Sequence, residues 1–447
     1  MVSRTEGDIN LTPERSKWQE KFLSQDTINV LAEDSDVFIH QALSSPCLDC
    51  VTGVDGIYLY TKDGRKIMDF HGNSVHQLGY NHPYLISALE KQLRTLSFSP
   101  RRFTNEKAIA LAQKLSALNG GGKKVLFTPS GSSSIGLALK MVRYTKKKFK
   151  TISLWDSFHG ANLDAISVGG ESHFRKNIGP LLPGTEHIMP YNSYRCPFGD
   201  CKACNFKCLD YLEYICRCEG DIGAIIMEPV RCTDVQIPPK EYYKRIRRIC
   251  DDYDIALIFD EIPTAFGRTG KMFVYQHYDI EPDILVVGKG LGGALYPISA
   301  VIAKESFDVC EEISLGHYTH EKSPLGAAVG LALIEYIEKA NLLEKVEEIG
   351  NDMTQRLQKM QERFACIGDV RSIGALLAVE LVKDRESKEK DVMLAERILY
   401  RCLEYGLSFK VSQGNVLTLA PPLIISQEEL TRAMDILEKA IEEQQRN

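Results

Sequence analysis

The sequence predicts an α/β protein with a large domain built on a mainly parallel β-sheet flanked by helices, and a second, smaller α+β domain. Two observations support this prediction. Between residues 123 and 290, short apolar runs alternate with helical segments, as in parallel strands joined by crossover helices. After residue 305, long amphipathic segments replace that alternation. The 447 residues are enough to bury a large core.

The individual elements follow from local patterns. The polar first forty residues are predicted to be helical, and residues 56–70 to form a β-hairpin around Asp63-Gly64. Strands are expected at KKVLFT, TISLW, GAIIME, IALIFD and DILVV. Helical periodicity covers residues 83–96, 105–118, 132–148, 240–253, 325–364 and 391–405. We expect residues 1–70 to contribute to the small domain, 71–305 to form the large domain, and 306–447 to lie mostly in the small domain.

Composition excludes several classes of function. A net charge of −6 gives no reason to expect binding to nucleic acid or to a membrane surface. No apolar run approaches 18 residues, and the polar N-terminus lacks the apolar stretch of a signal peptide. Thirteen cysteines, an odd number unevenly spread, suit reduced thiols better than a disulfide framework. We therefore expect a cytoplasmic protein.

Four groups of polar residues follow the predicted strands: Ser130–Ser134, Glu228, Asp260 and Lys289. Active residues of parallel sheets belong at the carboxyl ends of the strands, so these groups are candidates for one site. Each also has an ordinary explanation. The serines around Gly131 suit either an anion site at a helix N-terminus or a simple helix cap.

Asp260 and Lys289 each end an apolar strand. A carboxylate there needs a cation or a strong donor, although a helix cap or a structural salt bridge would serve equally. A lysine desolvated beside other cations loses its proton readily, as a Schiff-base nucleophile must, whereas an isolated lysine more often reaches the surface. Together the three groups suit a ligand with a phosphate, a protonatable ring nitrogen and an aldehyde. Pyridoxal 5′-phosphate (PLP) has all three.

Longer motifs make the resemblance specific. The chain resembles the class III aminotransferases, which are fold type I PLP enzymes with a seven-stranded sheet in the large domain. The matching stretches are LGYNHP (78–83), the expected phosphate-binding loop TPSGSSSIGLALK (128–140), FHG (158–160), MEPV (227–230), DEIPTAFGRTGKMF (260–273), PDILVVGKGLGG (282–293) and APPLIIS (420–426).

The resemblance implies roles for individual residues. Lys289 would hold PLP as a Schiff base and then move protons, while Asp260 would keep the pyridine nitrogen protonated. His159 would lie beside the ring as a further catalytic residue. The remaining cofactor contacts would come from Gly131, Ser132, Phe158, Glu228 and, from the partner subunit, Thr319. That last match implies a homodimer with shared active sites.

Three departures from the family pattern bear on function. SGSSSIG replaces a stretch such as SGSEANE, from which we conclude nothing. Pro263 stands where the family has a glutamine that bonds to the cofactor's ring hydroxyl oxygen, and proline offers no donor. Thr418, in NVLTLAPPL, stands where transaminases have an arginine that pairs with the substrate α-carboxylate. A transaminase must bind a keto acid, so the loss of this arginine argues against transamination.

Another anion anchor is then required. Arg101 and Arg102 are adjacent in SFSPRRFTNE, where the family chain enters the partner's active site, and could clamp a phosphonate. A solvated basic loop is the alternative. Asn73, Ser74 and His76 lie in a segment that usually faces the substrate.

The stretches PRRFTN, HGNSVHQ, WDSFHGANLDAISVGGE, DEIPTA and GHYTHEKSP resemble the ammonia-lyases of this family that degrade a hydroxylated aminoethylphosphonate. That resemblance implies β-elimination of the hydroxyl, giving phosphonoacetaldehyde and ammonia without a keto acid. Lys289, His159 or His76 would be the general acid. The alternatives are a transaminase of an amine or ω-amino acid, and a silent structural paralogue, which Lys289 and Asp260 argue against.

A cysteine-rich insertion occupies residues 196–218 and holds six of the thirteen cysteines. Cys196, Cys201, Cys204 and Cys208 have spacings that would suit a structural zinc site or an iron–sulfur cluster. Free thiols in a surface insertion are the alternative. We expect a metal.

Overall fold

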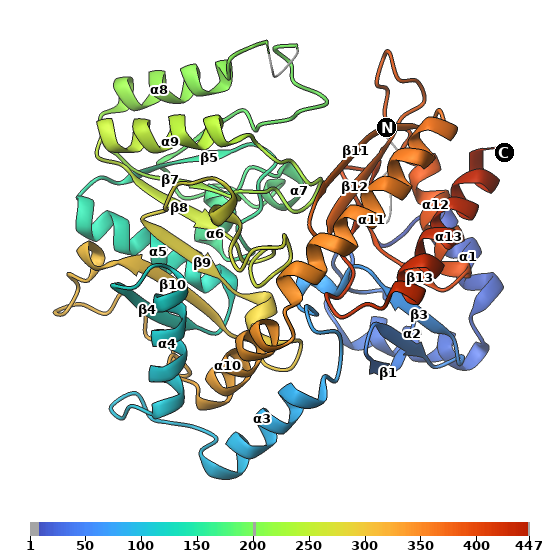
Figure 1. The fold of residues 1–447 in the computed structure, drawn as a ribbon, viewed down its shortest axis with the longest axis horizontal. Coiled ribbons are helices and arrows are strands. Elements are labelled where there is room, and N and C mark those ends of the chain that lie inside the picture. Colours follow the sequence, from blue (N-terminus) through green and yellow to red (C-terminus); the bar gives the residue numbers. More distant parts are fainter. Residues whose placement is uncertain (1–8, 200–202, 446–447) are drawn as a thin grey trace.

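The large domain is built on a seven-stranded, mainly parallel sheet. The computed structural model describes residues 9–199 and 203–445 (Figure 1). The strand order is β4-β10-β9-β8-β7-β5-β6, and only β10 runs antiparallel to its neighbours. The strands are β4 (Lys123–Thr128), β5 (Lys150–Leu154), β6 (Thr185–Ile188), β7 (Ile222–Met227), β8 (Ala256–Asp260), β9 (Ile284–Val287) and β10 (Ser299–Lys304). The predicted fold class is confirmed.

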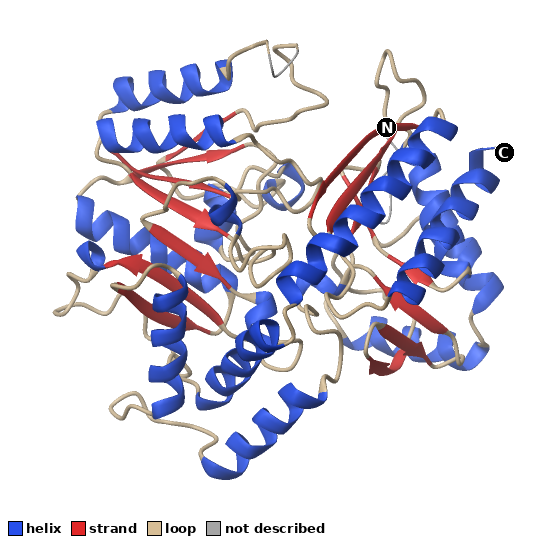
Figure 2. Cartoon of the chain, viewed as in Figure 1, coloured by secondary structure: helices blue, strands red, loops and turns tan. Residues whose placement is uncertain are grey.

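Helices cover both faces of this sheet, as Figure 2 shows. Ala256 and Ile258 of β8 pack toward α5 (Gly131–Lys146), while Leu257 and Phe259 pack with residues of α9 (Lys240–Asp252). Since both faces are covered, the strand is apolar throughout until it ends at Asp260. The other helices near this part of the sheet are α6 (Leu163–Val168), α7 (Ser172–Arg175) and α8 (Lys207–Glu219).

The small domain contains two mainly antiparallel four-stranded sheets. One has the order β11-β12-β15-β14, and the other has the order β1-β2-β3-β13, in which only β13 pairs parallel. The predicted hairpin is confirmed as β2 and β3. The strands are β1 (Val51–Asp55), β2 (Tyr58–Thr61), β3 (Lys66–Asp69), β11 (Ile367–Ile373), β12 (Leu376–Leu381), β13 (Leu407–Ser408), β14 (Lys410–Ser412) and β15 (Val416–Leu419). The helices are α1 (Pro13–Phe22), α2 (Gln25–Val37), α11 (Leu342–Arg363), α12 (Val392–Glu404) and α13 (Gln427–Gln445).

The long periodic segment at residues 325–364 is two helices. Helix α10 (Pro324–Lys339) and α11 are separated by Asn341, whose φ of 50° breaks the helix in a conformation that asparagine tolerates. Helix α10 packs on α3 (Pro83–Thr95), α4 (Glu106–Leu118) and the short helix η3 (Lys289–Gly292), all in the large domain. The domain division drawn from the sequence stays a prediction.

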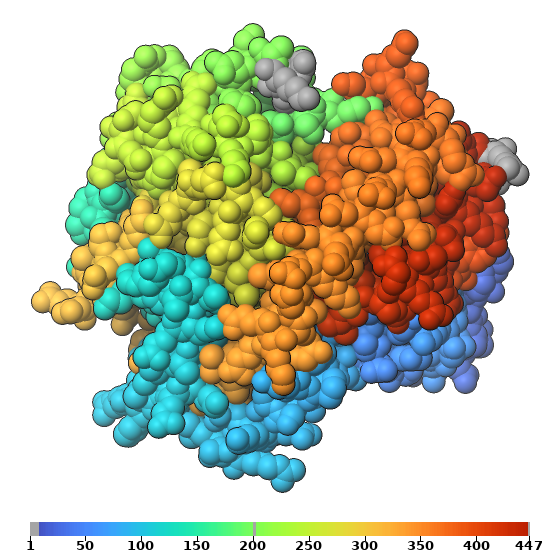
Figure 3. All heavy atoms as spheres, viewed as in Figure 1, coloured from blue at the N-terminus to red at the C-terminus, as the bar shows by residue number. Residues whose placement is uncertain are grey.

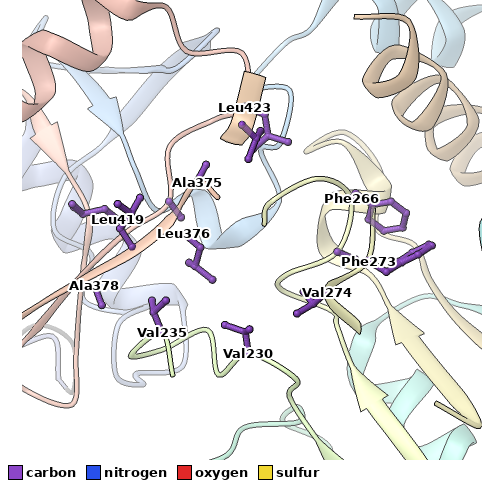
Figure 4. Close-up of a cluster of buried hydrophobic side chains, with 14 of the residues drawn as sticks. Val230, Val235, Phe266, Phe273, Val274, Ala375, Leu376, Ala378, Leu419 and Leu423 are labelled. Atoms are coloured by element: carbon purple, nitrogen blue, oxygen red, sulfur yellow. The ribbon is translucent and has the colours of Figure 1, made fainter. Parts of the chain in front are cut away.

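The two domains share one hydrophobic core. Val230 and Val274 of the large domain and Leu376 and Leu419 of the small domain belong to the same buried cluster (Figure 4). The space-filling view shows the orange and red atoms of residues 342–445 meeting the yellow and green atoms of the large domain along a continuous seam (Figure 3). Among the described helices, none is long and apolar enough to cross a membrane. A cytoplasmic location stays a prediction.

Candidate active site

Lys289 begins η3, directly after strand β9, and its side chain is exposed in the single chain. Its φ of 39° is unusual for a residue other than glycine. The flanking glycines are required by close packing: a Cβ on Gly288 would meet Ser299 Oγ at 2.9 Å, and one on Gly290 would meet Gln77 Nε2 at 2.2 Å. The backbone therefore presents Lys289 in one strained conformation, which is typical of functional sites.

Asp260, at the end of β8, forms a buried pair with His159. His159 Nδ1 lies 2.8 Å from Asp260 Oδ2, and the two residues are only 1% and 2% exposed. Because a carboxylate only accepts hydrogen bonds, His159 Nδ1 carries the proton. The amide of Ile262 donates to Asp260 Oδ1 at 3.0 Å. His159 thus holds the carboxylate in position and has no access to solvent.

The N-terminus of α5 offers free amides. Ser130 is the helix cap, and its Oγ accepts from the amide of Ser133 at 3.2 Å. Within the described chain, the amides of Gly131 and Ser132 have no hydrogen-bond partner. The Ser132 hydroxyl accepts from the amide of Ala161 at 3.0 Å. The cap explanation therefore applies to Ser130, and the next two amides remain available for an anion.

Glu228 connects the two loops that border Asp260. Its Oε1 accepts from the amide of Phe158 at 3.4 Å, and its Oε2 accepts from the amide of Cys232 at 3.1 Å. Burial raises the pKa of Glu228, although His159 opposes the shift. The Phe158 ring packs against Phe174 with centroids 4.5 Å apart. Both predicted residues are placed beside Asp260.

Residues 71–77 lie over η3, because the short helix η1 (Gly72–Ser74) contacts it. Asn73 is exposed, while Ser74 is buried. His76 is fully buried, and its Nε2 bonds to the carbonyl oxygen of Asp69 at 3.0 Å. His76 therefore has no open path to a substrate in the single chain, although the segment carrying it borders Lys289.

The residues predicted to act across subunits lie at the surface. Arg102 and Thr319 are exposed, and Arg101 lies 3.9 Å from Glu321. Both arginines line a groove of about 450 Å³ together with residues 307–316. Lys289 and Asp260 do not line that groove. The structure does not bring the two arginines to the Lys289 of the same chain.

The cysteine cluster is only partly described. Cys201 lies outside the described residues. Within residues 9–199 and 203–445, no group of three His, Cys, Asp or Glu side chains is placed to hold a metal, and no cysteine forms a disulfide. Burial raises the pKa of the Cys208 thiol to about 11, and Cys204 and Cys196 raise it further.

One nearby residue was missed in the sequence. Lys410 of β14 pairs with Thr418 of β15, the position at which transaminases have their arginine. No local pattern in FKVS indicates this, because the pairing depends on the register of two strands.

The geometry and the comparisons with known proteins agree on the class of protein. Residues 40–441 match the family model described as aminotransferase class-III, so the chain belongs to the class III aminotransferase family. PLP is the cofactor of that family. The lysine, the buried carboxylate and the free amides of this chain fit its aldehyde, its ring nitrogen and its phosphate.

Three individual proteins of known name are similar to this chain over most of its length. The (R)-1-hydroxy-2-aminoethylphosphonate ammonia-lyase of Vibrio splendidus (strain 12B01) is 53% identical over 454 residues, covering 98% of this chain and 95% of that protein. The leucine/methionine racemase of Thermococcus litoralis is 36% identical, covering 84% and 87%. The solved taurine:2-oxoglutarate aminotransferase of Bifidobacterium kashiwanohense, in complex with PLP and glutamate, is 27% identical, with a TM-score of 0.88 over 94% of this chain and 98% of that chain.

Proposed function

We propose that this chain is a PLP-dependent ammonia-lyase that converts (R)-1-hydroxy-2-aminoethylphosphonate to phosphonoacetaldehyde and ammonia. The observation that carries the proposal is the 53% identity, over 98% of the chain, to a lyase of that name. The absence of the carboxylate-binding arginine at Thr418 supports it independently. Thr418 Oγ1 donates to the carbonyl oxygen of Thr233 at 2.6 Å, so this side chain is engaged within the protein.

When bound, PLP supplies an electron sink for the carbon that carries the substrate nitrogen. Lys289 would hold its aldehyde carbon covalently until the substrate amine takes its place. Asp260, fixed by His159 and the Ile262 amide, would face the ring nitrogen and keep it protonated. Gly131 and Ser132 would donate their free amides to the phosphate.

The reaction balances without a second substrate. The freed amine of Lys289 removes a proton from the carbon bearing nitrogen, and the hydroxyl on the neighbouring carbon leaves as water after gaining a proton. Once Lys289 has taken back its own bond to the cofactor, the released enamine would become an imine, and one water would hydrolyse it to the aldehyde and ammonia. No keto acid takes part.

The same lysine would supply the proton to the leaving hydroxyl. His159 and His76 are at most 1% exposed and are engaged with Asp260 and Asp69, respectively. Lys289 is exposed beside them and has no hydrogen-bond or ion-pair partner within the described chain. It is therefore the group best placed to act first as base and then as acid.

An ammonia-release assay tests the proposal. We expect ammonia and phosphonoacetaldehyde from the hydroxylated substrate with no keto acid present. Formation of glutamate or alanine from 2-oxoglutarate or pyruvate, without ammonia release, would instead establish a transaminase. Lys289→Ala is expected to abolish turnover, and borohydride reduction followed by mass spectrometry should find no PLP attached to its chain. Unchanged turnover in that variant would refute the assignment.

The active form would be a homodimer in which Thr319, Arg101 and Arg102 enter the partner's site. Large apolar side chains close to these arginines in the sequence are exposed: Phe98, Phe103 and Ile109 are 38%, 65% and 43% exposed. An exposed apolar patch of this kind is typical of a protein interface. Light scattering on the eluting protein tests the dimer.

The four cysteines Cys196, Cys201, Cys204 and Cys208 would hold a structural zinc ion or an iron–sulfur cluster. The C-x4-C-x2-C-x3-C spacing of these cysteines supports this. Elemental analysis of the purified protein tests it: since such sites bind tightly, less than about 0.2 metal ions per chain would dismiss it.

A further inference from the structure

Lys410 lies directly across the sheet from Thr418. Strands β14 and β15 are antiparallel, with Lys410 paired to Thr418 and Ser412 paired to Val416. Side chains of paired residues point to the same face of a sheet. Thr418 reaches the carbonyl oxygen of Thr233, in the loop that follows β7 at the edge of the active site. The Lys410 side chain therefore starts from the face of the small-domain sheet that meets the active site.

Backbone hydrogen bonds hold the start of the segment 70–77 close to Lys410 and Thr418. The amide of Phe70 donates to the carbonyl oxygen of Ser408, and the amide of Ala420 donates to the carbonyl oxygen of Phe70, both at 2.8 Å. Phe70 is thus fixed between Ser408 of β13, two residues before Lys410, and Ala420, two residues after Thr418. The chain then continues through His71 into η1, which contacts η3, where Lys289 begins.

The charges of Lys410 and Lys289 both affect the pKa values of two residues from different segments, His71 and Cys232. Burial lowers the pKa of His71 to about 4; Asp69 opposes this, and the charges of Lys410 and Lys289 lower it further. Burial raises the pKa of the Cys232 thiol, and the charges of Lys289 and Lys410 oppose that shift. Both ammonium groups therefore lie close to the same space, bordered by His71 and by Cys232.

Two arginines near this space are neutralised by carboxylates. Arg231 binds Asp234, and its Nε donates to Asp234 Oδ1 at 2.5 Å. Arg371 contacts Glu380 at 2.8 Å, and it also contacts Asp369. Lys410 differs from them because it is partly exposed and, within the described residues, has neither an ion pair nor a hydrogen bond. Its charge is left for a ligand.

We propose that Lys410 binds the phosphonate group of the substrate and takes over the task of the arginine that transaminases carry at the position of Thr418. The forked, planar guanidinium matches a planar carboxylate, whereas the compact ammonium of lysine is a point charge that suits a tetrahedral dianion. The inference rests on the proposed function for the identity of the substrate. Lys410 would bind this anion together with the arginines that enter from the partner subunit.

Lys410→Ala tests the site by two measurements. A charge-assisted contact of this kind corresponds to roughly 10- to 100-fold in affinity, so we expect KM for the hydroxylated aminoethylphosphonate to rise by that factor. The turnover number should change far less, because the phosphonate does not react. Calorimetric titration of the holoenzyme with ethylphosphonate, which has no amine, should show the same loss of affinity.

Two further variants serve as controls. Lys410→Arg keeps the positive charge and should recover most of the ethylphosphonate affinity, which a purely structural role for the lysine side chain would not explain. Lys383→Ala removes an exposed lysine paired with Glu389 on the same domain and should leave both measurements unchanged. Unaltered KM and ethylphosphonate affinity in Lys410→Ala would overturn the inference even if ammonia is released. If the enzyme releases no ammonia but loses ethylphosphonate binding in this variant, the anion site stands and the proposed reaction fails.

Discussion

The carboxylate of Asp260 keeps lone pairs for a ligand while two donors hold it. His159 occupies one oxygen and the amide of Ile262 the other, and each carboxylate oxygen can accept two hydrogen bonds. The remaining lone pairs can bind a protonated ring nitrogen. An asparagine at position 260 would keep the shape of the aspartate side chain and lose its negative charge.

Asp260→Asn isolates that charge. Because electrostatic partners of a developing charge typically contribute 10²–10³ in turnover, we expect a loss of about that size. Circular dichroism and thermal melting should change little, since asparagine can still accept from His159. Asp279→Asn, an exposed aspartate paired with Lys240, is the matched control and should keep full activity. Equal activity of the two variants would contradict the role of Asp260.

The lowered pKa of His76 makes the free energy of unfolding depend on pH. Burial lowers its pKa to about 4, whereas an unfolded histidine titrates near 6.5. Between these values the unfolded chain binds a proton that the folded chain does not, so stability falls as pH drops. For this group alone, the free energy of unfolding should decrease by about 2 kcal/mol from pH 6.5 to pH 4.5.

The measurement is urea unfolding at several pH values. His76→Gln keeps a donor for the Asp69 carbonyl oxygen and removes the titration, so its curve should be flatter than that of the wild type over this range. His317→Gln, at an exposed position, should follow the wild type. Identical slopes for all three proteins would count against the shifted pKa.

At the scale of elements, the N-terminus of α5 depends on a glycine in another loop. Gly160 has a φ of 130°, and a Cβ there would meet Ser132 Oγ at 2.3 Å. The close approach allows the Ala161 amide to reach that hydroxyl. The helix start and the loop after β5 are therefore set as one unit, with the free amides of Gly131 and Ser132 between them.

Gly160→Ala should weaken cofactor binding. Overpacking of this kind costs roughly 1–3 kcal/mol, so the PLP dissociation constant is expected to rise about tenfold or more. Fluorescence titration of the apoprotein with PLP measures it. Gly53→Ala, in β1, is the control, because its Cβ would meet only Tyr60 at an ordinary 3.8 Å. An unchanged dissociation constant in Gly160→Ala would show that the phosphate site tolerates the displacement.

The sequence predicts those elements that a local pattern specifies, and it does not predict features that depend on contacts between distant segments. The positions of Asp260 and Lys289 at the ends of strands were predictable because each strand is an unbroken apolar run buried on both faces. Strand β6 reads TEHI and shows no such run, and nothing in SAVIAK indicates that β10 runs antiparallel. The break at Asn341 is a single left-handed residue inside a continuous helical period. Lys410 was out of reach because its place depends on strand register across the small domain.

At the scale of the whole molecule, the seam between the domains is held by polar contacts as well as by the shared core. Arg371 Nε donates to the carbonyl oxygen of Asp234 at 3.0 Å, and Thr418 donates to the carbonyl oxygen of Thr233. Both contacts join the small-domain sheet to the loop after β7. The small-domain sheet and the loop after β7 are thereby kept in fixed relation to each other.

The last prediction concerns sites shared between two chains. Lys289→Ala and the double variant Arg101→Ala/Arg102→Ala should each be inactive alone. If the arginines act in the partner's site, a mixed dimer has one site with both lesions and one site with none. Random assembly makes half of the dimers mixed, so co-expression should restore about one quarter of the wild-type sites, because each twofold dimer has two equivalent sites. If the arginines serve their own chain, every site keeps one lesion and the ammonia-release assay finds no recovery.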